Sequence, residues 1–194
     1  MIAAALVGAV VLALSAWAAA APAVPRWEAR AFATVNGLPH VLWPILWLPM
    51  QVGNLVVGAA LGLIVAIALR DVALALAVLA AVAAKLVAER WLRARLLPVL
   101  EVRQRPGSSQ ALVAIRGDDV PTEGVSFPSG HAILAAALAT LLYDPLGPWL
   151  GWGLVAVAVL AGVGRVFVGA HNPLDVLAGW GAGMVIGGVL GVIQ

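Results

Sequence analysis

A histidine followed four residues later by an aspartate is the arrangement in this sequence best suited to chemistry. The segment Gly164–Asp175 contains Arg165, His171 and Asp175. At this spacing His171 and Asp175 can share one helical face, so that the carboxylate holds one imidazole nitrogen and leaves the other free to attack. The guanidinium of Arg165 matches the geometry of phosphate oxygens. The simpler interpretation is a salt bridge between Arg165 and Asp175, with His171 as a bystander.

A second polar segment, residues 126–131, reads S-F-P-S-G-H and is followed by apolar sequence. We expect Pro128 to start a helix there. A helix N-terminus has unsatisfied N–H groups and a partial positive charge, so it can bind an anion. Gly130 lets a phosphate approach closely, the Ser129 hydroxyl can donate to it, and His131 can protonate a departing oxygen. A plain helix cap with an interfacial histidine would give the same sequence.

The elements that must position these residues are apolar helices. The chain has 63% hydrophobic and only 10% charged residues, and a mean hydropathy of +1.06, all outside the usual range of soluble domains. A helix needs about 20 apolar residues to cross a bilayer. Runs without any Asp, Glu, Lys or Arg cover residues 1–25, 31–69, 124–143, 145–164 and 176–194.

We therefore predict an all-α, integral membrane six-helix bundle that forms a single domain over residues 1–194. The spans are predicted at residues 3–21, 42–68, 72–92, 127–143, 148–167 and 174–192. A polar loop over about residues 93–126 is the longest connection. Residues 1–21 are expected to be a retained helix and not a signal peptide, because no cationic segment precedes them.

This order of spans brings three polar segments to one face of the membrane. They are the segments 85–105, 126–131 and 165–175. Because ionisable groups in or beside a membrane are costly, their convergence predicts a functional site. Of the 11 Lys and Arg residues, only Arg70 falls on the opposite face, so the positive-inside rule favours a cytoplasmic site in a multi-pass protein of the cell membrane.

The two histidine segments together resemble the type 2 phosphatidic acid phosphatase superfamily, which also includes the vanadium haloperoxidases and glucose-6-phosphatase. Residues 128–131 match its second motif, P-S-G-H, and residues 165–175 match the R-x-x-x-x-x-H-x-x-x-D of its third. The resemblance implies a phosphohistidine intermediate on His171 and an orienting role for Asp175. It also implies that His131 is the general acid and that no metal ion or other cofactor takes part.

The sequence departs from this family in two places. Gly164 stands where the third motif usually has serine, and Lys85 is not followed by an R-P pair at the spacing of the first motif, K-x-x-x-x-x-x-R-P. The R-P pair at Arg105 is the replacement we favour, with Arg90 and Arg93 as alternatives. The predicted phosphate-binding residues are Lys85, Arg105, Ser129, Gly130 and Arg165.

The function predicted from these features is hydrolysis of a phosphomonoester or pyrophosphate of an isoprenoid lipid or glycerophospholipid. The alternative is a catalytically inactive phospholipid-binding membrane protein of the same fold. The expected partners are the lipid phosphate and the bilayer, since a net charge of +2 is too small to indicate nucleic acid. The sequence does not indicate an oligomeric state. The remaining arginines expected at the membrane interface are Arg26, Arg30, Arg95, Arg103 and Arg116.

Overall fold

Helices make up most of the computed structural model, which describes residues 1–21, 23–96, 103–110, 112–117 and 120–193. The prediction of an all-α membrane fold is confirmed. In chain order the elements are α1 (Ile2–Ala19), α2 (Arg26–Asn36), η1 (His40–Leu42), α3 (Trp43–Met50), η2 (Gln51–Gly53), α4 (Leu55–Ala68), α5 (Val72–Leu96), α6 (Pro106–Ser109), α7 (Gly130–Leu141), α8 (Tyr143–Phe167) and α9 (Pro173–Ile193).

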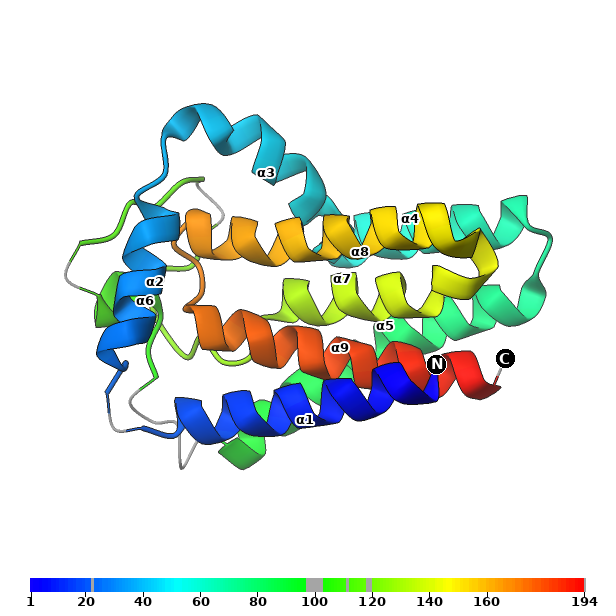
Figure 1. The fold of residues 1–194 in the computed structure, drawn as a ribbon, viewed down its shortest axis with the longest axis horizontal. Coiled ribbons are helices and arrows are strands. Elements are labelled where there is room, and N and C mark those ends of the chain that lie inside the picture. The colour runs from blue at the N-terminus through cyan, green and yellow to red at the C-terminus, as the bar shows by residue number, and fades with distance from the viewer. Residues whose placement is uncertain (22, 97–102, 111, 118–119, 194) are drawn as a thin grey trace.

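The long helices form a bundle with α7 in its middle (Figure 1). Helices α1, α4, α5, α8 and α9 run roughly along the same axis, and α2 crosses one end of the bundle beside α6. We call this the polar end, because α7 and α9 begin there, α8 finishes there, and the segments that carry the predicted site residues meet there. Both chain termini lie at the opposite end.

Within the described residues, four helices are long and apolar enough to cross a membrane, so the predicted count of six spans is not confirmed. They are Ile2–Ala19, Val72–Leu92, Tyr143–Phe167 and Pro173–Ile193, and the bent pair Arg26–Asn36 and His40–Gly53 makes a fifth when it is counted as one span. Helix α7 has only 12 residues, and ten of them are buried. At about 1.5 Å per residue it is roughly 18 Å long, well short of a hydrocarbon core of about 30 Å. Its apolar sequence therefore reflects burial among other helices.

The predicted continuous span over residues 42–68 is wrong. The chain instead forms α3, η2 and α4, and Pro49 lies inside the short α3. The Asn54 side chain caps α4 by accepting from the N–H groups of Val56 and Val57, at 3.0 and 3.2 Å. Proline and an asparagine cap are both typical of helix ends, which explains the break. As a result Gly53 packs directly against the backbone of His131 at the start of α7.

Glycines on two faces of α9 let the neighbouring backbones come close. A Cβ atom at Gly179, Gly183 or Gly187 would overlap α7, and one at Gly181 or Gly188 would overlap α1. Small residues at such spacings are common where membrane helices pack tightly. This close packing fixes the register of α7 against α9, and hence the relative positions of the polar residues at their first turns.

Candidate active site

The site is built where α7 and α9 begin side by side. The backbone N–H of Ser129 donates to the carbonyl oxygen of Asp175 at 2.9 Å, which ties the two helix starts together. Ser129 has extended backbone angles and is the N-cap of α7, so the helix begins at Gly130. The prediction that Pro128 starts this helix is therefore wrong, since the extended Ser129 separates it from the first turn. The N–H groups of that turn still point toward the polar end.

The Ser129 side chain is buried without a partner. Its exposed fraction is 0%, and its Oγ atom has no hydrogen bond in the described part of the chain. A buried hydroxyl without a partner costs free energy, so such groups usually serve a ligand or a function. This geometry suits the predicted role of Ser129 as a donor to a phosphate oxygen.

His171 and Asp175 lie together in the buried centre of the polar end, with exposed fractions of 3% and 0%. The imidazole Nδ1 is 3.8 Å from Asp175 Oδ2, which is longer than a hydrogen bond. The carboxylate accepts at both oxygens from other groups: Oδ2 from the Asn172 N–H and Oδ1 from Arg103 Nε, each at 2.8 Å. Asp175 thus faces Nδ1, while Nε2 is the nitrogen available for attack. The direct hydrogen bond between the two side chains stays a prediction.

Arg103 is a site residue that the sequence did not reveal. The prediction that places it at the membrane interface is wrong. Its exposed fraction is 4%, and it bridges Asp175 and Glu28. Glu28 is itself fully buried and also accepts from the N–H of Leu174 at 2.9 Å. Burial works against the charge of Arg103, but the two carboxylates raise its pKa above the ordinary value. The ion-paired cluster holds the start of α9 against α2.

Two further arginines lie near the imidazole of His171. Arg165 comes from the last turn of α8 and has an exposed fraction of 7%. Arg105 donates from Nη1 to the carbonyl oxygen of Ala170 at 2.9 Å, next to His171. Burial, together with the charges of Arg165 and Arg105, lowers the pKa of His171 to about 4 against the opposing effect of Asp175. His171 is therefore neutral at neutral pH, the form in which it can attack.

Helix α5 contributes Lys85, whose Nζ atom lies 2.7 Å from Glu89 Oε2. The Glu89 carboxylate in turn packs against Gly130, where an added Cβ would come within 2.7 Å of Oε2. Burial, together with the charges of Arg165, His171 and Lys85, lowers the pKa of His131 to about 3, so a proton on this imidazole depends on an anion bound beside it. Of the alternatives for the first motif, Arg90 is exposed, and the Arg93 side chain is outside the described residues.

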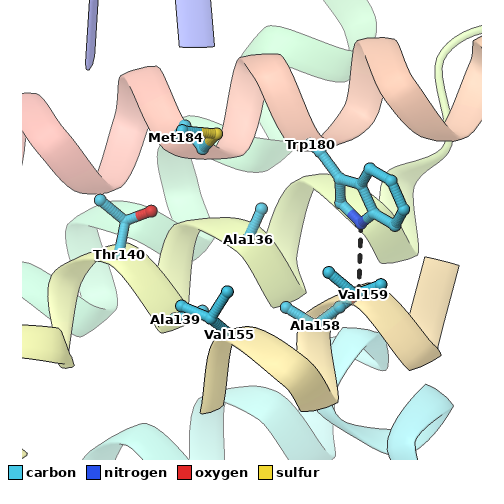
Figure 2. A pocket seen from close by; sticks show the side chains of 8 residues that line it. All are labelled: Ala136, Ala139, Thr140, Val155, Ala158, Val159, Trp180 and Met184. Atoms are coloured by element: carbon cyan, nitrogen blue, oxygen red, sulfur yellow. Dashed lines mark hydrogen bonds between the residues drawn. The ribbon is translucent and has the colours of Figure 1, made fainter. Parts of the chain in front are cut away.

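A small polar cavity of about 40 Å³ opens beside these groups. Its lining includes Trp43, Trp47, Gln51, Arg116, His131 and Arg165. A larger pocket of about 180 Å³ lies between α7, α8 and α9, where Trp180 donates to the carbonyl oxygen of Ala158 at 3.1 Å (Figure 2). That pocket is apolar and contains none of the predicted site residues, so the small polar cavity is the better candidate for phosphate chemistry.

The family model described as the PAP2 superfamily matches residues 68–193, more than half of the chain and all of the predicted site. Among curated proteins, an undecaprenyl-diphosphatase of Sulfolobus acidocaldarius is 47% identical over 62 residues, which is 31% of this chain and 29% of that protein. A putative undecaprenyl-diphosphatase of Escherichia coli is 45% identical over 62 residues, 31% of this chain and 30% of that protein. The matches thus span less than a third of each relative's length.

Two solved structures share the fold. The crystal structure of LpxE from Aquifex aeolicus has a TM-score of 0.68 and 25% identity, and covers 84% of this chain and 92% of its own. A PAP2-type phosphatidylglycerolphosphate phosphatase from Bacillus subtilis has a TM-score of 0.69 and covers 95% of this chain and 94% of its own. At 19% identity the second likeness concerns the fold alone.

Proposed function

Because the chain belongs to the PAP2 superfamily, we propose that it is a lipid phosphate phosphatase of the cell membrane. Its substrate is a phosphomonoester or diphosphate of an isoprenoid lipid or glycerophospholipid. The observation that carries this proposal is the buried His171, whose Nδ1 faces the Asp175 carboxylate at 3.8 Å and on which the charges of Arg165 and Arg105 act. The packing of α1 along α9 supports the further proposal that residues 1–194 form one domain.

The proposed reaction has two displacements. Nε2 of His171 attacks phosphorus while Asp175 and Arg103 fix the imidazole from the Nδ1 side, and His131 protonates the leaving oxygen. Water then cleaves the phosphohistidine and releases inorganic phosphate. Catalysis of this kind depends mostly on positioning and on neutralising the phosphate oxygens. The groups proposed to do so are Lys85, Arg105, Ser129, Gly130 and Arg165.

An inactive phospholipid-binding protein of the same fold is the competing interpretation. Binding alone would require the cations and the start of α7, but not a neutral imidazole facing a buried carboxylate. A carboxylate beside Nδ1 is the usual way to orient an imidazole for attack. Asp175 is in turn held by Arg103, and burying such charges is costly. The Arg103–Asp175 pair therefore favours catalysis over binding.

The direct test is phosphate release by the purified protein in detergent. The panel should contain farnesyl diphosphate, farnesyl phosphate, phosphatidic acid and phosphatidylglycerol phosphate. Release from at least one lipid, lost when the protein is heat-denatured beforehand, would support the proposal. Binding of these lipids without any release would establish the inactive alternative instead.

The low pKa of His171 predicts an unusual pH profile. Protonation removes the nucleophile, so kcat/KM should fall with decreasing pH only as the pH approaches about 4, well below the ordinary histidine value of 6.5. Removing a nearby positive charge with Arg105→Gln should raise the pKa and move this acidic limb to higher pH. A limb caused by ionisation of the substrate would not move in the variant. An acidic limb that is unchanged by Arg105→Gln would contradict the assignment.

We also predict that chelators will leave activity intact and that vanadate will inhibit. In the part of the chain that the structure describes, no three His, Asp or Glu residues form a group suited to a metal ion. Vanadate adopts the five-coordinate geometry of phosphoryl transfer and should bind the same cations as the substrate. Activity measured after dialysis against EDTA, and again after adding Mg²⁺ or Zn²⁺, checks the first point. Loss on dialysis and recovery with either ion would show a metal-dependent reaction.

A further inference from the structure

The polar cavity next to His131 defines where the leaving group must lie. In the proposed reaction, on which this inference rests, His131 protonates the oxygen that departs from phosphorus. The group attached to that oxygen must therefore occupy the His131 side of the site. That side is the small cavity that His131 lines together with Arg165 and Arg116. The chemistry of the cavity wall thus indicates the chemistry of the leaving group.

Arg116 brings a second guanidinium to this cavity, outside the residues that match the family motifs. Its Nη1 donates to the carbonyl oxygens of Phe167 at 2.6 Å and Ala114 at 3.4 Å, and its Nη2 to that of Leu38 at 3.1 Å. The guanidinium carbon also lies 4.2 Å from the centre of the Phe167 ring. These contacts hold the side chain in place. Carbonyl oxygens do not neutralise its charge.

A count of donors shows that Arg116 can still bind an anion. A guanidinium has five N–H groups, and the three carbonyl contacts use three of them. The Nε–H and one Nη2–H have no acceptor in the described ranges. These two donors can bind two oxygens of one phosphate in the bidentate manner typical of arginine. A hydrocarbon leaving group at this position would cover the charge of Arg116 without offering any acceptor.

We infer that Arg116 binds the leaving phosphate of a lipid diphosphate, which makes diphosphates the preferred substrates. The terminal phosphate lies among Lys85, Arg105 and Arg165. Nε2 of His171 forms a bond to the terminal phosphorus, and the bond from that phosphorus to the bridging oxygen breaks. The electron pair stays on the bridging oxygen, which takes the proton of His131. The departing lipid monophosphate is held by Arg116, and water releases the terminal phosphate from His171.

The experiment compares farnesyl diphosphate with farnesyl phosphate, which carry the same hydrocarbon chain. For Arg116→Gln, kcat/KM with the diphosphate should fall about ten- to a hundredfold, the effect typical of a hydrogen bond to a charged group. The value with the monophosphate should change little, because that substrate has no second phosphate. Arg116→Lys keeps the charge but loses the paired N–H donors of the guanidinium. Its kcat/KM with the diphosphate should therefore lie between the values for Arg116→Gln and the wild type. The exposed Arg30 of α2, the helix that crosses the same polar end, provides the matched control, Arg30→Gln, which should leave both values unchanged.

The ratio of the two substrates separates the possible outcomes. A selective loss with the diphosphate supports the inference, and Arg116→Lys gives the same test if Arg116→Gln does not fold. An equal loss with both substrates means that Arg116 only holds the surrounding loop, and overturns it. Unchanged kcat/KM values with both substrates in both Arg116 variants overturn it too, while leaving the phosphatase function intact. If the wild-type protein hydrolyses neither substrate nor any other lipid phosphate, the proposed function itself fails.

Discussion

His171→Ala is expected to lower phosphate release by at least about a thousandfold, because removing a covalent nucleophile eliminates the reaction path and not merely one contact. His171 is buried and neutral at neutral pH, and it lies near the cations that would hold the phosphate. Its loss should leave substrate binding largely in place, since Arg165 and Arg105 remain. The expected result is therefore a collapse of kcat with little change in lipid affinity.

A trapping experiment identifies the intermediate directly. Brief incubation with a ³²P-labelled substrate, followed by denaturation, should leave acid-labile, alkali-stable label on the wild-type protein and none on His171→Ala. The matched control is His40→Ala, because His40 is exposed, lies on η1 and is not among the proposed site residues. It should keep both turnover and label. If label persists on a folded His171→Ala protein, another residue is the nucleophile.

The sequence predicted the parts of the site whose residues lie close together along the chain. Ser129, Gly130 and His131 occupy consecutive positions at the start of α7, and His171 and Asp175 are four residues apart, with His171 two residues before α9 and Asp175 in its first turn. The short separation along the chain keeps these side chains close together, although His171 precedes α9 and the predicted shared helical face is therefore wrong. The arrangement could therefore be inferred without knowing how α7 and α9 pack together.

The break between α3 and α4 was missed because uniform hydropathy concealed it. Residues 42–68 contain no charge, so the run is long enough for one span, and only Pro49, Gly53 and Asn54 mark the interruption. Similarly, the run around α7 is apolar because the helix is buried among its neighbours. Hydropathy does not distinguish a side chain that faces lipid from one that faces protein. The number of spans was therefore less predictable than the helical fold.

The ion-paired cluster of Arg103, Glu28 and Asp175 could not be deduced from spacing. Glu28 is 75 positions from Arg103 and 146 from Leu174, so only tertiary packing brings them together. One sequence signal was available: Glu28 is the sole acidic residue among the first 70. An isolated acid in a chain so rich in apolar residues needs a partner, and the sequence offered several arginines without ranking Arg103 above the others.

Arg103→Met is the second substitution with a large expected effect. It would leave the carboxylates of Glu28 and Asp175 buried without their shared partner, and breaking a buried ion pair typically costs about 3–5 kcal/mol of stability. We expect a corresponding fall in the unfolding free energy in detergent. We also expect kcat to fall roughly ten- to a hundredfold, because Asp175 loses the hydrogen bond to Oδ1 that holds it beside His171.

A purely structural role for Arg103 can be separated from a positioning role by the pH profile. Without Arg103, the negative charge of Asp175 acts on His171 unopposed, so the pKa of the imidazole should rise and the acidic limb of kcat/KM should move to higher pH. Glu28→Gln retains an acceptor for the Leu174 N–H and leaves Arg103 paired with Asp175, so it should shift the limb far less. If Arg103→Met lowers stability and kcat but leaves the limb where it is in the wild type, Arg103 supports the fold without orienting the catalytic pair.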